Sequence, residues 1–116
     1  MKSLLGIIFV AMMAIYSGAA LASIQFTPWM KLKSIGAGWY SAEFGVTPMD
    51  QNVYNPDSCA ISDGYVIDPS LGGATVFTST LTTAYASGHE VRLAIAGCYN
   101  DRPSIIGVTV RIPGTT

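Results

Sequence analysis

Two successive runs of alternating apolar and polar residues begin at residue 29. In the first, residues 29–35, Met30 and Leu32 face one side and two lysines face the other, which is the period of a half-buried strand. The second run, residues 40–47, alternates in the same way through Tyr40, Ala42, Phe44 and Val46. Glycines at positions 36 and 38 permit a tight turn between the two runs. The pattern therefore predicts an antiparallel hairpin.

A third strand is predicted in residues 59–68, after an irregular surface loop over residues 47–58. The dipeptide Asp63-Gly64 interrupts this strand and is typical of a two-residue hairpin turn. Because the arms on either side are only about four residues long, we favour a bulge within one longer strand.

Two more strands follow near the C-terminus. Residues 89–97 place Val91, Leu93 and Ile95 on one face, and Gly97-Cys98 then breaks the alternation. This break predicts a bulge that turns the sulfur of Cys98 toward Cys59. A polar turn over residues 99–103 leads to the last strand, residues 105–112. The residues expected to face inward from that strand are Ile106, Val108, Val110 and Ile112.

One helix is predicted, over residues 74–87. Phe77, Leu81, Ala84 and Tyr85 recur at helical spacing and form a single apolar stripe. Most other positions are Thr or Ser, which are mediocre helix formers, so this helix needs a sheet to lie on. Gly88 stands where a left-handed C-terminal cap belongs.

The predicted order is strand, strand, strand, helix, strand, strand, a mainly β domain of the α+β class with one helix. A five-stranded sheet that closes around one helix is an OB-type barrel, and this is the fold that we predict. An open antiparallel sheet with the helix on one face is the alternative. Periodicity alone does not separate the two.

Residues 1–22 have the features of a cleaved signal peptide. Met1-Lys2 supplies a positive start, residues 4–15 are almost wholly apolar, and Ala20-Leu21-Ala22 offers small residues at a cleavage site. An N-terminal membrane anchor is the alternative, which the shortness of the apolar run disfavours. Cleavage leaves residues 23–116, which we predict to be one domain exported to the periplasm or secreted.

The charge of the chain gives no electrostatic reason to expect an anionic partner. One of the six basic residues, Lys2, lies in the leader, so the mature chain carries five basic and seven acidic residues, a net charge of −2. We therefore expect neither nucleic acid nor, after cleavage of the leader, a membrane as a partner.

The chain has two cysteines, Cys59 and Cys98, and export would place them in an oxidising compartment. There a pair of cysteines indicates a disulfide. Two free thiols or part of a metal site are the alternatives, but a single histidine does not complete four zinc ligands. A disulfide that closes a loop of about 40 residues stabilises the fold by about 4 kcal/mol in the entropy model.

Residues for catalysis are sparse. His89 lies beside Glu90 at a predicted helix-to-strand corner, but no nucleophile motif accompanies it. The acidic residues are scattered and form neither a glycosidase pair nor a calcium loop, and no glycine-rich phosphate motif is present. We therefore predict that the protein is not an enzyme and has no catalytic residues, metal ligands or cofactor.

Large aromatic residues are frequent for a chain of this size, and exposed rings can stack on a sugar or on a partner protein. Those considered are Trp29, Trp39, Tyr40, Tyr54, Tyr65 and Tyr99. The alternative is that they pack in the core or cover strand ends. The turn at residues 99–102 also offers hydrogen-bonding groups, although we interpret it as a simple turn. No ligand-binding residue is assigned.

The sequence AYASGHEVRL, residues 84–93, is followed by a strand, a short turn with Pro103 and a closing strand. This C-terminal third resembles the B subunits of the subtilase-cytotoxin and typhoid-toxin type, in which a helix ends in a Ser/Thr-Gly-x-x-Val-Arg-hydrophobic stretch. The resemblance implies a secreted OB-fold subunit that forms a ring of five and binds host glycans. The Tyr-rich sugar-contacting segment of that family has no match in residues 23–28, so no glycan-contacting residue is carried over.

Together these features predict an exported, disulfide-stabilised binding module that resembles an oligomeric, glycan-binding toxin B subunit. The candidate partners are a host glycan, a partner protein subunit or further copies of the same chain. The alternative is a periplasmic or secreted structural or interaction protein with no small-molecule ligand.

Overall fold

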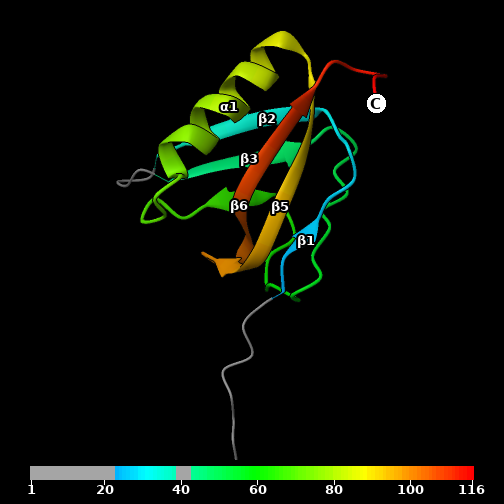
Figure 1. Ribbon diagram of the computed structural model, residues 1–116. Coiled ribbons are helices and arrows are strands. Elements are labelled where there is room, and N and C mark those ends of the chain that lie inside the picture. The colour runs from blue at the N-terminus through cyan, green and yellow to red at the C-terminus, as the bar shows by residue number, and fades with distance from the viewer. Residues whose placement is uncertain (1–22, 39–42) are drawn as a thin grey trace, which may run out of the picture.

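The computed structural model describes residues 23–38 and 43–116. The elements in these ranges (Figure 1) are β1 (Gln25–Phe26), β2 (Leu32–Ala37), β3 (Phe44–Pro48), β4 (Tyr65–Ile67), α1 (Ala74–Ser87), β5 (Glu90–Tyr99) and β6 (Arg102–Arg111). The predicted signal peptide, residues 1–22, and the start of the predicted second strand, residues 40–42, lie outside the described residues, as does Trp39. In the described part of the chain, no helix has the length and apolar character needed to cross a membrane.

The strands form one mixed sheet in the order β1-β5-β6-β4-β3-β2. Neighbouring strands are antiparallel except β4 and β6, which are parallel. The β5–β6 hairpin runs at a steep angle to the β2–β3 hairpin (Figure 1). The prediction of a mainly β domain with one helix is confirmed.

The prediction of a closed five-stranded barrel is not confirmed, because the sheet is open, has six strands and has β1 and β2 at its two edges. The additional strand arises near Pro28, which has no N–H and interrupts pairing along the N-terminal segment. β1 on one side of this proline pairs with β5, whereas β2 on the other side pairs with β3. The alternative prediction of an open antiparallel sheet is correct in that the sheet is open. It is wrong in that β4 and β6 are parallel.

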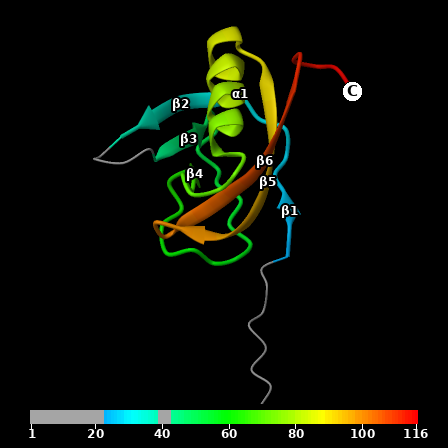
Figure 2. The ribbon, with the colours of Figure 1, turned by 60° about the vertical axis from the view of Figure 1, so that its left-hand side comes forward.

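The helix α1 has the predicted bounds and lies against the sheet, between β5 and the β2–β3 hairpin in the view of Figure 2. Its buried residues are Ala74, Leu81 and Ala84, and Phe77 packs against the core. Tyr85, which the sequence pattern placed in the same stripe, is instead 43 % exposed. Gly88 ends the helix at a φ of 71°, and its N–H donates to the carbonyl of Tyr85.

The hydrophobic core fills the space between α1 and one face of the sheet. Its largest fully buried aliphatic side chains are Ile67, Leu81, Leu93, Ile95 and Ile105. In the last strand, Val108 and Val110 pack against the core as predicted, but Ile105 is buried and Ile112 is 61 % exposed. The pairing of β5 with β6 shifts between Ala94 and Ile95, and this shift changes which residues of β6 face inward.

The third predicted strand is much shorter than expected. Only Tyr65–Ile67 is a strand, and residues 59–64 are irregular. The bulge predicted at Gly97-Cys98 is present: the pairing of β5 with β6 shifts again between Ile95 and Cys98, and Gly97 has a φ of 70°.

Candidate ligand-binding groove

A cavity of about 420 Å³ opens beside β2, β3 and β4. It is lined by residues of β2 and β3, by Asp63 and Gly64 before β4, and by Asn100 and Arg102 at the turn between β5 and β6. We call this cavity the groove. Gly45 and Thr47 alternate along β3 with the buried residues Phe44 and Val46, so they face away from the core. The groove therefore lies on the sheet face opposite the hydrophobic core.

A row of residues in register on neighbouring strands, two of them glycine, crosses the floor of the groove. Gly36 of β2 pairs with Gly45 of β3, which in turn pairs with Val66 of β4. The same row continues to Ser104 of β6. Because the two glycines carry no side chain, a ligand can approach the backbone of β2 and β3 closely.

The rim of the groove carries polar side chains from three separate segments of the chain. Asn100 Nδ2 donates to Glu43 Oε1. Arg102 Nε and Nη2 donate to Asp63 Oδ1 and Oδ2 over 2.6 and 3.0 Å, and its Nη1 donates to the Asn100 carbonyl over 3.1 Å. This fork geometry fixes both partners of the ion pair.

The turn that presents Asn100 and Arg102 is a two-residue hairpin turn. Its central residues, Asn100 and Asp101, have φ angles of 49° and 64°. Left-handed conformation at both positions is the geometry that matches the twist of an antiparallel pair, and Asn and Asp tolerate it better than other side chains do. The residue types at this turn therefore suit its backbone.

The electrostatics of the rim follow from these contacts. Hydrogen bonding from Arg102 holds the pKa of Asp63 below its ordinary value, and Asp63 raises the pKa of Arg102. Loss of hydration raises the pKa of the Tyr99 hydroxyl, and the carboxylates of Glu43 and Asp68 raise it further. At neutral pH the rim therefore carries a charged ion pair, and the Tyr99 phenol near it is neutral.

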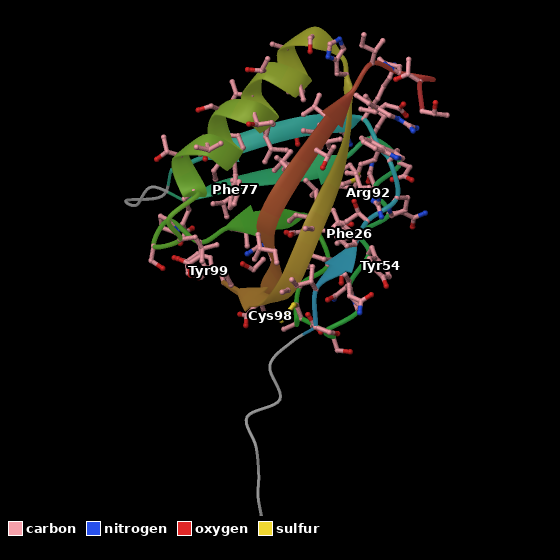
Figure 3. The ribbon with its side chains drawn as sticks, viewed as in Figure 1. Phe26, Tyr54, Phe77, Arg92, Cys98 and Tyr99 are labelled. Atoms are coloured by element: carbon pink, nitrogen blue, oxygen red, sulfur yellow. A yellow bond between two sulfur atoms is a disulfide. The ribbon has the colours of Figure 1, made fainter. Side chains whose placement is uncertain are left out.

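The predicted disulfide between Cys59 and Cys98 is present, with Cα atoms 5.7 Å apart. Cys98 lies at the end of β5, next to Tyr99 (Figure 3). The bond therefore attaches the loop before β4 to the strand that leads into the rim of the groove.

This disulfide is one of four contacts between two segments, residues 57–63 and residues 97–102, which we call the clasp. The contacts are Asp57 Oδ2 with the Gly97 N–H (2.7 Å), the disulfide, the Ile61 N–H with the Asp101 carbonyl (2.8 Å), and Asp63 with Arg102 (2.6 Å). They come from every second residue of the first segment. The clasp explains why residues 59–64 do not extend β4.

The aromatic residues considered from the sequence do not gather at one place. Tyr65 is 1 % exposed, and its hydroxyl accepts a hydrogen bond from the Tyr54 N–H over 2.6 Å. The Arg111 guanidinium lies 4.2 Å from the ring centroid of Trp29. Tyr99 is at the end of β5 near the rim, whereas Tyr54 lies near β1 (Figure 3). Trp39 and Tyr40 lie outside the described residues.

The polar groups of the rim were not singled out as a site from the sequence. The sequence predicts a simple turn at residues 99–102, which is correct for its backbone but does not indicate that the turn lies beside the groove. A polar two-residue turn between two strands was the only signal, and its partners Glu43 and Asp63 come from distant parts of the chain. Glu90, beside His89, accepts instead from Arg111 Nε over 3.1 Å and from the Gly114 N–H over 3.2 Å.

Comparisons with protein-family models, with curated proteins and with solved structures found no match. Among the described residues, no group of three or more His, Cys, Asp or Glu side chains is placed to hold a metal ion.

Proposed function

We propose that this chain is an exported, disulfide-stabilised binding module that holds an uncharged oligosaccharide in the groove, and that it is not an enzyme. The observation that carries the proposal is the combination of a floor of small residues with a rim of fixed hydrogen-bonding groups. The volume of about 420 Å³ lies within the range of ordinary small-ligand sites.

The chemistry of the rim favours a ligand with many hydroxyl groups. A sugar hydroxyl both donates and accepts, so it can donate to the carboxylates of Glu43 and Asp63 and accept from Asn100 or Arg102. The two carboxylates outnumber the guanidinium of Arg102 among the groove-lining residues. A phosphate-bearing ligand is therefore repelled, and an uncharged sugar is preferred.

We propose further that this open sheet corresponds to a partly open, five-stranded OB-type barrel in which residues 25–37 act as one bent strand. Between β1 and β2, the Met30 N–H donates to the Val91 carbonyl over 2.9 Å and the Val91 N–H donates to the Met30 carbonyl over 2.8 Å. These bonds keep the segment against β5 on its way to β2. In OB-type domains the second and third strands and the loops after the first and fourth strands bind oligosaccharides. The Asn100-Asp101 turn holds the second of those loop positions in this scheme.

The resemblance to toxin B subunits supports a more specific form of this proposal, an oligomeric subunit that binds a host glycan. The disulfide is compatible with export, because such bonds persist in oxidising compartments. Size-exclusion chromatography with light scattering measures the number of copies, and a glycan array tests for a ligand. A monomer that binds no glycan would exclude the toxin-like role.

A substitution in the floor of the groove tests the site itself. A side chain at Gly36 would enter the groove, because nothing lies within 4 Å of its Cβ position. We expect Gly36→Phe to weaken binding of the best array glycan at least tenfold in calorimetry, with little change in thermal stability. Gly72→Phe is the matched control, since its Cβ position is equally open and Gly72 does not line the groove. Equal affinity of the two variants would exclude the groove as the binding site.

A structural or interaction role without a small-molecule ligand is the second candidate, and the outer face of α1 favours it. The 14 residues of this helix include no charged side chain, and Val76 is 65 % exposed. Hydroxyl groups that donate to the carbonyl four residues earlier belong to Ser79, Thr80, Thr82, Thr83 and Ser87. With these donors occupied, the face is easily removed from water by another protein. If α1 is an interface, Val76→Lys reduces the number of copies seen by light scattering.

A further inference from the structure

Asp57 is the residue of the clasp that contacts the bulge in β5. Its Oδ2 accepts a hydrogen bond from the Gly97 N–H over 2.7 Å, although the two residues are 40 positions apart in the sequence. Gly97 lies where the pairing of β5 with β6 shifts, and its φ is 70°. A partly buried amide at a bulge needs an acceptor outside the strand ladder, and a carboxylate is a strong one.

The segment that follows Gly97 carries the rim of the groove. Cys98 comes next, followed by Tyr99 and the turn that presents Asn100 and Arg102. A displacement of the bulge therefore moves the turn relative to β3, and with it the hydrogen bond between Asn100 and Glu43.

The loop that carries Asp57 is itself attached to the core, so it can act as a support. Just before it, the Tyr54 N–H donates to the hydroxyl of the buried Tyr65 over 2.6 Å. Asn55 Nδ2 donates to the Cys59 carbonyl over 2.9 Å, and its Oδ1 accepts from the Cys59 N–H over 2.8 Å. Asp57 thus lies between two anchored positions, one at Asn55 and one at the disulfide.

We propose that Asp57 is a positioning residue for the groove: its carboxylate fixes the bulge at Gly97 and thereby sets the position of Asn100 and Arg102 toward the ligand. This inference rests on the proposed function in that the groove is the binding site. Asp57 itself does not line the groove, so it acts through the turn.

The test compares three variants by calorimetry with the glycan selected on the array. Asp57→Ala removes the acceptor, and we expect the Kd to rise at least tenfold. Asp57→Asn retains an oxygen for the Gly97 N–H, and we expect a Kd within twofold of wild type. Asp50→Ala is the matched control, because it removes the same charge from the same loop and its carboxylate bonds locally to the Asn52 N–H over 3.0 Å. Wild-type affinity in Asp57→Ala, or an equal loss in Asp50→Ala, overturns the proposal.

Amide hydrogen exchange supplies a measurement that needs no ligand. We expect the Ile61 N–H, which donates to the Asp101 carbonyl, to exchange at least tenfold faster in Asp57→Ala and at the wild-type rate in Asp57→Asn. The Val91 N–H reports global opening of the fold, and its exchange rate is expected to be unchanged.

If wild type binds no glycan, the proposed function fails, and the exchange rates alone decide whether Asp57 positions the turn. Unchanged exchange at Ile61 overturns the positioning role; Asp57→Ser repeats the test if Asp57→Ala does not fold.

Discussion

The ion pair between Asp63 and Arg102 shows how a single pair of residues joins two distant segments at the rim of the groove. Both Arg102 Nε and Nη2 donate to the carboxylate, over 2.6 and 3.0 Å. The side chains are nevertheless 60 % and 33 % exposed, so water screens much of their attraction. The pair therefore matters more for the position of the guanidinium than for the stability of the fold.

The effect of this pair on stability has a defined pH dependence. The folded-state pKa of Asp63 is lowered from 3.8, so its stabilising effect is present above the unfolded-state value and is lost as the pH falls through the folded-state value. We expect Asp63→Asn to lower the free energy of unfolding by about 0.5 kcal/mol at neutral pH and by less at a pH of ~2. Urea unfolding of both proteins at the two pH values measures this difference. A loss that persists unchanged in acid would contradict it.

Contacts between single residues were predicted well where the residue type leaves only one possible partner. Cys59 and Cys98 are the only two cysteines, so their pairing followed from composition and compartment. The contact between Asn100 and Glu43 had no such signal, because many polar residues compete for each partner. Which residue of β6 faces inward depended on a register shift at Ala94 and Ile95, and no local pattern marks that shift.

Among the elements, α1 owes its existence to the sheet beneath it. Its Thr and Ser residues have low helix propensity, and Gly73 at its N-terminus provides no side-chain cap. Burial of Leu81 and Ala84, both 0 % exposed, supplies the stabilisation that propensity does not.

Truncation of the buried face should therefore be far more harmful than truncation of the exposed face. We expect Leu81→Ala to lower the free energy of unfolding by about 2 to 5 kcal/mol, because it leaves a cavity in the core. Val76→Ala, at a position 65 % exposed, is expected to change it by less than about 0.5 kcal/mol. Chemical denaturation followed by circular dichroism gives both values, and similar losses in the two variants would show that α1 is not held by its buried face.

Elements with a complete local signal were predicted accurately, and those defined by tertiary contacts were not. The bounds of α1 followed from an apolar stripe and a terminal glycine. Cys59, Ile61 and Asp63 alternate as residues of a strand do, but they contact the end of β5, the turn after it and the first residue of β6, and residues 59–64 form no strand. A pattern with period two is the same for both arrangements, so the sequence could not distinguish them.

On the scale of the whole molecule, the apolar–polar periodicity of the sequence could not predict whether the sheet closes into a barrel. The parallel pair of β4 and β6 results from the route of the chain through α1 and β5 between them. The break at Pro28 divides the N-terminal segment between both edges of the sheet. Because the small floor of the groove requires Gly36, Gly45 and Val66 in one row, the candidate site also depended on this pairing.

The disulfide is the bond on which the stability of the whole molecule depends most, since it joins positions 39 residues apart in a small domain. Reduction releases that loop in the unfolded chain, so we expect the free energy of unfolding to fall by about 4 kcal/mol, a large share of the total for a domain of this size. Guanidinium unfolding with and without a dithiol reductant measures the change. The Cys59→Ser, Cys98→Ser double variant is the control, because its unfolding should match that of the reduced wild type and should not respond to the reductant. If oxidised and reduced wild type unfold at the same denaturant concentration, the bond does not stabilise the fold through the unfolded chain and the prediction is wrong.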